Sequence, residues 1–270
     1  MRSTLFTILA FLLISNAFAD TEPNNTQQDA TPLPQDSSVV GTQSDDDWYV
    51  IDVVAGNRIL IDLTFSHADG NINMALWKGT AARAIAETSS DDEFIDNDIS
   101  GLGVGKYYIV VNGDDKGNSY RLTWTELTGT DDDFEENDSS AAAKPISKDV
   151  VNFGSQSDED WYSINVTLGN RGVLASLRFA NNDDLDMVLR DTDGNELASS
   201  ANPTTSPDGR NEVINFEVST AGTYHLQITG TNSGDGYALD WSSTGVNELP
   251  QATANTVSTT ENTPYNFKAS

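Results

Sequence analysis

The sequence of 270 residues contains no cysteine and only two histidines, His67 and His225. Without cysteine the chain can form neither disulfide bonds nor thiolate metal sites, and it has no cysteine nucleophile. Two histidines leave little material for a histidine-based metal centre, and we expect both at the protein surface. A Ser-His-Asp triad would depend on one of these two side chains being placed by chance. We therefore predict that this chain is not an enzyme.

Positively charged residues are also scarce. The chain has 14 Lys+Arg against 42 Asp+Glu, so its formal net charge is −28. Nucleic-acid binding depends on Lys and Arg side chains that neutralise phosphates, which excludes nucleic acid as a natural partner. Anionic membrane surfaces attract basic segments and are disfavoured for the same reason. The composition favours an acidic binding or spacer module.

Long hydrophobic runs are absent apart from Leu5–Ile14, which follows the single positive charge of Arg2. Ala17 and Ala19 give the small-x-small pattern that precedes a signal-peptidase cut. Ten apolar residues are too few to span a bilayer, which needs about 20. We expect residues 1–19 to be a signal peptide and the mature chain to be secreted, outside the cell or at its surface, without membrane insertion. A buried N-terminal helix or strand is the alternative.

The rest of the chain contains an internal repeat. The acidic motif that ends in Trp48 and Tyr49 recurs at Trp161 and Tyr162, 113 residues later. Self-similarity of this kind indicates tandem copies of one structural unit. We predict a first domain at 20–127, a linker at 128–134 and a second domain at 135–245. Three further motif pairs keep the same order: Gly56-Asn-Arg58 with Gly169-Asn-Arg171, Gly105-Lys-Tyr107 with Gly222-Thr-Tyr224, and Tyr120-Arg-Leu-Thr-Trp124 with Tyr237-Ala-Leu-Asp-Trp241.

Hydrophobic residues alternate with a period of two in both copies. Tyr49, Ile51 and Val53 follow this pattern, and so do Tyr107, Ile109 and Val111. Short alternating strands separated by Gly, Asn and Asp turns indicate antiparallel sheets with one solvated face. About 105 residues is an ordinary size for a β-sandwich. The sequence therefore predicts an all-β protein of two tandem antiparallel sandwiches.

Both copies contain, in order, the motifs Glu-x-Asn-[Asn/Asp], Asp-x-Asp-Trp-Tyr, Gly-Asn-Arg, Gly-[Lys/Thr]-Tyr and Tyr-x-Leu. This series resembles the bacterial pre-peptidase C-terminal (PPC) domain, which is similar to the collagen-binding domains of clostridial collagenases. The resemblance implies a jelly-roll-like β-sandwich, secretion, attachment to proteases or other exoenzymes, and calcium binding in some members. Residues 246–270 resemble the start of a cadherin-like tandem repeat, so we expect the chain to be a piece of a longer protein.

Two acidic segments recur in each copy, and calcium prefers six to eight oxygen ligands of this kind. The resemblance implies calcium sites formed by both segments. The second site should be stronger, because Asp138 stands where the first copy has Asn25. Solvated acidic loops are the alternative, and zinc is disfavoured because neither cluster has cysteine or histidine nearby. The predicted ligands are Asp20, Glu22, Asn24, Asn25, Asp45 and Asp47 in the first copy, and Asp133, Glu135, Asn137, Asp138, Asp158 and Asp160 in the second.

Trp77 is the one tryptophan without a counterpart in the other copy, where Arg190 takes its place. Strand parity puts it on the opposite face from Met74. It is a candidate ligand-binding residue, and a contact between domains or an ordinary surface position are the alternatives.

Two functions fit these expectations. The first is a secreted, monomeric, non-catalytic calcium-binding module for targeting, adhesion or spacing, with an insoluble extracellular polymer as partner, either a collagen-like protein or a polysaccharide. The second is an accessory segment of a secreted exoenzyme, with a protease as the first candidate, whose catalytic domain lies outside this chain. A purely mechanical spacer without a ligand is a third possibility.

Overall fold

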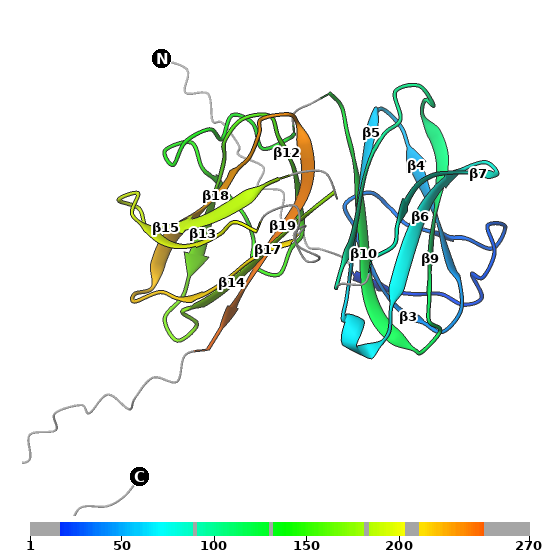
Figure 1. Cartoon of the computed structure of the whole chain (residues 1–270), viewed down its shortest axis with the longest axis horizontal. Coiled ribbons are helices and arrows are strands. Elements are labelled where there is room, and N and C mark those ends of the chain that lie inside the picture. Colours follow the sequence, from blue (N-terminus) through cyan, green and yellow to red (C-terminus); the bar gives the residue numbers. More distant parts are fainter. Residues whose placement is uncertain (1–16, 89–90, 130–131, 181–183, 203–210, 246–270) are drawn as a thin grey trace, which may run out of the picture.

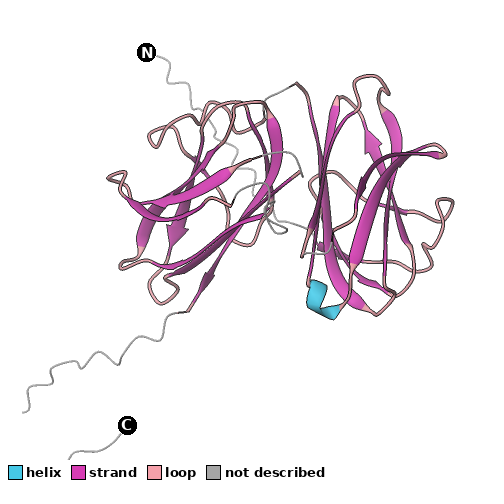
Figure 2. Cartoon of the chain, in the orientation of Figure 1, coloured by secondary structure: helices cyan, strands magenta, loops and turns pink. Residues whose placement is uncertain are grey.

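The computed structural model describes residues 17–88, 91–129, 132–180, 184–202 and 211–245 (Figure 1). Apart from a 3₁₀ turn at His67–Asp69, its regular structure consists of β-strands (Figure 2). Within the described residues, no helix is long and apolar enough to cross a membrane. The strands form four sheets arranged as two sandwiches, which confirms the predicted all-β class.

The first sandwich pairs two five-stranded sheets. Sheet A has the order β1-β3-β10-β5-β8, and sheet B has the order β2-β4-β9-β6-β7. In sheet A the bounds are β1 Ala17–Ala19, β3 Ser38–Gln43, β10 Asn118–Leu127, β5 Arg58–Phe65 and β8 Glu93–Asp98. In sheet B they are β2 Thr31–Pro32, β4 Asp47–Val53, β9 Gly105–Gly113, β6 Ile72–Lys78 and β7 Ala81–Ala86.

The second sandwich repeats this plan. Sheet C has the order β11-β13-β18-β15-β16, and sheet D has the order β12-β19-β14-β17. In sheet C the bounds are β11 Lys144–Pro145, β13 Asp160–Val166, β18 Gly222–Thr229, β15 Asp186–Arg190 and β16 Glu196–Ser200. In sheet D they are β12 Asn152–Gln156, β19 Asp235–Thr244, β14 Gly172–Phe179 and β17 Asn211–Glu217.

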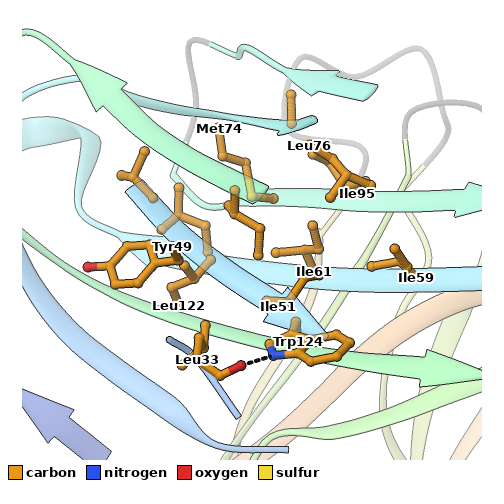
Figure 3. Close-up of a cluster of buried hydrophobic side chains, with 14 of the residues drawn as sticks. Leu33, Tyr49, Ile51, Ile59, Ile61, Met74, Leu76, Ile95, Leu122 and Trp124 are labelled. Carbon is orange, nitrogen blue, oxygen red and sulfur yellow. Dashed lines mark hydrogen bonds between the residues drawn. The ribbon is translucent and has the colours of Figure 1, made fainter. Parts of the chain in front are cut away.

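The alternating residues form the cores, as the period of two predicts. Tyr49 and Ile51 of β4 and Ile61 of β5 are all 0% exposed and pack between the two sheets (Figure 3). The indole of Trp124 also lies in this core, where its Nε1–H donates to the carbonyl oxygen of Leu33 at 2.9 Å (Figure 3). A buried polar group needs such a partner.

Most strand pairs are antiparallel, but three short edge pairs are parallel: β1 with β3, β2 with β4, and β11 with β13. Strand β1 consists of the last three residues of the predicted signal peptide. In the uncleaved chain these residues therefore pair with β3. Residues 1–16 and the tail at 246–270, predicted to be cadherin-like, lie outside the described residues. Cleavage after Ala19 stays a prediction.

The two sandwiches pack against each other through the outer faces of sheets A and D (Figure 1). Arg178 of β14 is 2% exposed and donates to both Asp62 oxygens at 2.6 and 2.9 Å. It also donates to Asp240 at 2.6 Å. Beside this ion pair lies an apolar cluster formed by both sandwiches: Leu60, Phe94, Leu127, Phe153 and Ala238.

Candidate metal sites at the acidic clusters

The first acidic cluster joins the segment after β1 to the start of β4. One carboxylate oxygen each from Asp20, Glu22 and Asp47 lies within 4.8 Å of the others. The backbone fixes this arrangement, because the Trp48 N–H donates to the carbonyl oxygen of Asn24 at 2.9 Å. Three carboxylates this close repel one another unless a proton or a cation lies between them.

Two buried oxygen atoms beside this cluster point to a ligand. Asn24 and Asp47 are both 0% exposed. The Asn24 side-chain nitrogen donates to Asp20 at 2.9 Å, but Oδ1 of Asn24 and Oδ1 of Asp47 have no hydrogen-bond partner among the described residues. A buried acceptor left without a partner costs about 1–3 kcal/mol. A hard cation that prefers oxygen ligands fits this donor set.

The second cluster contains two overlapping sets of carboxylates. Asp132, Glu135 and Asp160 form one set, and Glu135 forms the other with Asp138 and Asp158. In the first copy the position of Asp138 is occupied by Asn25, whose side-chain nitrogen donates to Asp45 at 2.7 Å. The second copy therefore offers more carboxylate oxygens.

The structure places Asp132, rather than the predicted Asp133, beside Glu135 and Asp160. A constant offset of 113 residues aligns Asp133 with Asp20. In the second copy the chain makes a turn at 133–134. Because of this turn the side chain of Asp132 reaches the cluster, and Asp133 is exposed. Asn137 is 0% exposed, and its side-chain nitrogen donates to the two Glu135 carboxylate oxygens at 3.3 and 3.2 Å.

A pair of buried tyrosines supports each cluster from below. In the first copy the Tyr49 and Tyr120 hydroxyls are 2.5 Å apart, and Tyr120 donates to Asp47 at 2.7 Å. In the second copy the corresponding distances are 2.6 Å between Tyr162 and Tyr237 and 2.8 Å from Tyr237 to Asp160. The Tyr-x-Leu and Asp-Trp-Tyr motifs supply these residues, but their contact could not be read from the motifs alone.

Burial changes the protonation of the deepest carboxyl groups. It raises the pKa of Asp47 to about 7; the hydrogen bond from Tyr120 opposes this shift, and the nearby carboxylates of Asp20 and Glu22 increase it. It likewise raises the pKa of Asp160 to about 8, against the hydrogen bond from Tyr237. These groups are poorly solvated in their charged form, and a divalent cation would favour that form.

The two positions predicted outside the acidic clusters, Trp77 and His225, are more buried than expected. Trp77 lies on the outward face of sheet B, as parity predicts, but it is partly buried and its ring centroid is 6.0 Å from that of Trp48. His225, expected at the surface, is 8% exposed and lies beside Trp161. Burial lowers its pKa. Its outward strand position misled the prediction, because neighbouring side chains cover that part of sheet C.

The duplicated clusters recur at the same register within a β-sandwich, and the second copy can be compared directly with known proteins. Residues 158–230 match the bacterial pre-peptidase C-terminal domain. PPC domains are non-catalytic accessory domains of secreted bacterial proteases. The first sandwich and the tail at 246–270 lie outside the matched range, so the cadherin-like resemblance of the tail has no support from this match.

Among curated proteins, the chain is 32% identical over 109 residues to a Deinococcus radiodurans protein described as a probable subtilase-type serine protease. The matched part is 37% of this chain, and it spans only 14% of that protein. Among solved structures, the pre-peptidase C-terminal domain of a collagenase from Bacillus anthracis is 18% identical, with 36% of this chain and 94% of that domain covered and a TM-score of 0.31. A protein from Eubacterium rectale described as secreted is 12% identical, with 82% of each chain covered and a TM-score of 0.28.

Proposed function

We propose that this chain is the calcium-stabilised, non-catalytic accessory part of a larger secreted bacterial protein. The duplicated acidic cluster carries the proposal. In each copy, three carboxylates and a fully buried asparagine lie over a tyrosine pair, and in the first copy two buried oxygens have no partner among the described residues. Burial of an asparagine and an aspartate at both equivalent positions favours a bound ligand over solvated acidic loops.

In this proposal the cation connects two segments of each copy. In the first copy these are the segment before β2 and the start of β4, and in the second copy the segment before β11 and the start of β13. Asp20, Glu22, Asn24 and Asp47 would hold it in the first copy, with Asn25 and Asp45 at its edge. In the second copy the ligands would be Asp132, Glu135, Asn137 and Asp160, with Asp138 and Asp158 supplying a second position. Calcium is the preferred ion because every donor is an oxygen atom.

Similarity to a subtilase-type protease favours the accessory segment of a secreted protease over a free-standing adhesion or spacer module. The chain would then help to direct or stabilise a catalytic domain that lies elsewhere in the parent protein. We also propose that the chain is a monomer and that it binds a collagen-like protein or a polysaccharide. Pull-down on insoluble collagen, chitin and cellulose tests that binding.

Calorimetric titration and thermal melting test the calcium sites. A ligand present at 100 times its Kd stabilises the native state by about 2.7 kcal/mol. This corresponds to a rise in Tm of roughly 5–10 °C for a folded unit of this size. We expect calcium to raise the Tm relative to EDTA at constant ionic strength. In the calorimetric titration we expect calcium binding to the second copy to release more heat than binding to the first.

The paired substitution Glu135→Gln with Asp160→Asn should remove the calcium response of the second copy. The control, Asp69→Asn with Glu87→Gln, removes the same charge at exposed positions away from the clusters and should leave that response intact. Equal Tm values in EDTA and in 2 mM calcium would show that the clusters are solvated loops. Loss of the response in the control as well would show a general charge effect.

A further inference from the structure

The outer face of sheet B carries a group of aromatic and aliphatic side chains. Trp48, Tyr108 and Trp77 come from the neighbouring strands β4, β9 and β6, and Tyr108 pairs with Val50 on one side and with Trp77 on the other. Ile85 of β7 is 59% exposed at the edge of this group. We call these residues, with Val110 and Ala75 between the tryptophans, the aromatic face.

This face is the most apolar of the outer sheet faces left open by the docking of the sandwiches. The outer faces of sheets A and D cover each other. The corresponding face of sheet C carries polar side chains that bond to one another, since Gln227 accepts from Arg190 at 2.7 Å and donates to Glu159 at 2.9 Å. The first sandwich has Val110 where the second has Gln227.

The second sandwich shows which group packs on the tryptophan at the position equivalent to Trp48. The guanidinium of Arg190 lies over the ring of Trp161, with its central carbon 5.9 Å from the ring centroid. Trp161 is the counterpart of Trp48, and Arg190 is the counterpart of Trp77. In the first sandwich a second indole therefore replaces the guanidinium, and the two indoles stand at 52° to each other. Among the described residues no cation lies over either of these two rings, although the exposed Arg83 of β7 shares the outward side of that strand with Ile85.

The surrounding charge also favours a cation. The loops at the Trp48 end of the face carry Asp46 and Asp115, which are both exposed and are not among the proposed calcium ligands. At the opposite end the Lys106 ammonium is 3.9 Å from Asp52, so that positive charge is already paired. With a net charge of −28, the whole chain attracts basic partners. Cations bind over the faces of tryptophan and tyrosine rings, and arginine does so more often than lysine.

We propose that the aromatic face binds a basic segment of a partner protein, with an arginine guanidinium stacked on Trp48 and Trp77 and directed towards Asp46. This inference goes beyond the proposed function and does not depend on the calcium sites. The partner is identified by its chemistry: an extended, arginine-containing peptide.

The test follows the indole N–H signals of the 15N-labelled chain by NMR during titration with the peptide Gly-Arg-Gly-Arg-Gly. The same peptide with citrulline in place of arginine keeps the shape of the side chain and removes its charge. We expect the signals of Trp48 and Trp77 to shift with the arginine peptide only, and we expect binding to weaken between 0.05 and 0.5 M salt. Salt screens the attraction between the guanidinium and the acidic loops, which is the cause of this weakening.

Trp77→Arg provides the decisive variant, because it installs the residue that the second sandwich already carries at this position. Its own guanidinium should occupy the stack and weaken peptide binding on the order of tenfold. Trp77→Phe keeps an aromatic ring and should retain most of the binding. Val54→Ala, at a 72% exposed position off this face, is the matched control and should bind normally.

Thermal melting checks that each variant folds. Equal binding of the citrulline peptide, or unchanged binding by a folded Trp77→Arg variant, would overturn the proposal. Shifts of the same two signals with chitin or cellulose oligosaccharides, but not with the arginine peptide, would assign the face to a polysaccharide and also overturn it.

Discussion

At the scale of single residues, the buried carboxyl groups of the two clusters connect stability to pH. Without a cation, the folded-state pKa values of Asp47 and Asp160 are about 7 and about 8. In the unfolded chain an aspartate has a pKa of about 3.9. Because the folded values are higher, the stability from these groups is fully present below pH 4 and is lost as the pH rises through 7 and 8.

We therefore expect the Tm in EDTA to fall as the pH rises from 5 to 8, and calcium to reduce this fall because it favours the charged carboxylates. Thermal melting at several pH values with and without calcium measures the effect. Repulsion among the many other acids also increases with pH, so the variant Asp47→Asn with Asp160→Asn is needed to separate the two causes. If this variant shows the same slope in EDTA as the unmodified chain, the two aspartates do not account for it.

Residue types and spacing predicted most of the cluster members, but the identity of one ligand depended on the path of the backbone. The repeat offset selects Asp133, whereas the turn at 133–134 brings Asp132 to the cluster. Three consecutive aspartates at 131–133 satisfy the same motif at sequence level. A choice among them requires backbone geometry, which a motif does not contain. The metal itself stays a prediction.

At the scale of elements, each tyrosine pair requires a glycine on the neighbouring strand. A Cβ atom on Gly41 of β3 would lie 2.3 Å from Cζ of Tyr120 in β10, and one on Gly154 of β12 would lie 2.2 Å from Cζ of Tyr237 in β19. Contacts this short force the ring or the strand to move. The glycines therefore allow the two strands to pair while the rings remain beneath the acidic clusters.

Gly41→Ala and Gly154→Ala should each destabilise the protein by about 1–3 kcal/mol, the usual cost of overpacking. They should also weaken calcium binding by the same copy, since the displaced tyrosine no longer supports Asp47 or Asp160. Urea unfolding and calorimetric titration measure the two effects. Gly101→Ala is the control, because no atom lies within 4 Å of its added Cβ. A neutral result for all three substitutions would contradict the close packing described.

The strands themselves were largely predictable, because successive side chains of a strand point to opposite faces of the sheet and so produce a hydrophobic period of two. The parallel edge pairs were not. Strands β2 and β11 contain two residues each, Thr31–Pro32 and Lys144–Pro145, and so few residues show no period. Proline is tolerated at such edge positions because one backbone N–H is not needed for the ladder.

At the scale of the whole molecule, the buried ion pair couples the two sandwiches. Burial opposes the positive charge of Arg178, but the carboxylates of Asp62 and Asp240 outweigh this effect and raise its pKa, so it stays charged. Removing one partner of a buried pair leaves the other charge uncompensated and costs about 3–5 kcal/mol. Nothing in the repeat pattern indicates this contact, because the paired positions differ between the copies.

Arg178→Met should therefore destabilise the chain by about 3–5 kcal/mol and give two unfolding transitions, where we expect one for the unmodified chain. The double variant Arg178→Met with Asp62→Leu should recover much of that loss, because it removes both fully buried charges and leaves only Asp240, whose side chain is partly exposed. Differential scanning calorimetry measures both properties. Lys106→Met is the control, since Lys106 forms a 3.9 Å pair at the surface. If Arg178→Met and Lys106→Met melt alike, the sandwiches fold independently.

The asymmetry of this ion pair also determines what the molecule can assemble into. In the second copy the strand position of Asp62 is occupied by Ser176, and in the first copy Thr64 stands where the second has Arg178. The contact between the two equivalent faces is therefore asymmetric: the first copy supplies the acid Asp62 and the second supplies the base Arg178. Two first copies would bring two acids together without an arginine, and two second copies would have no acid at the position of Asp62. This difference between the copies gives the shared face a fixed pairing, in which the charges match only when a first copy meets a second copy.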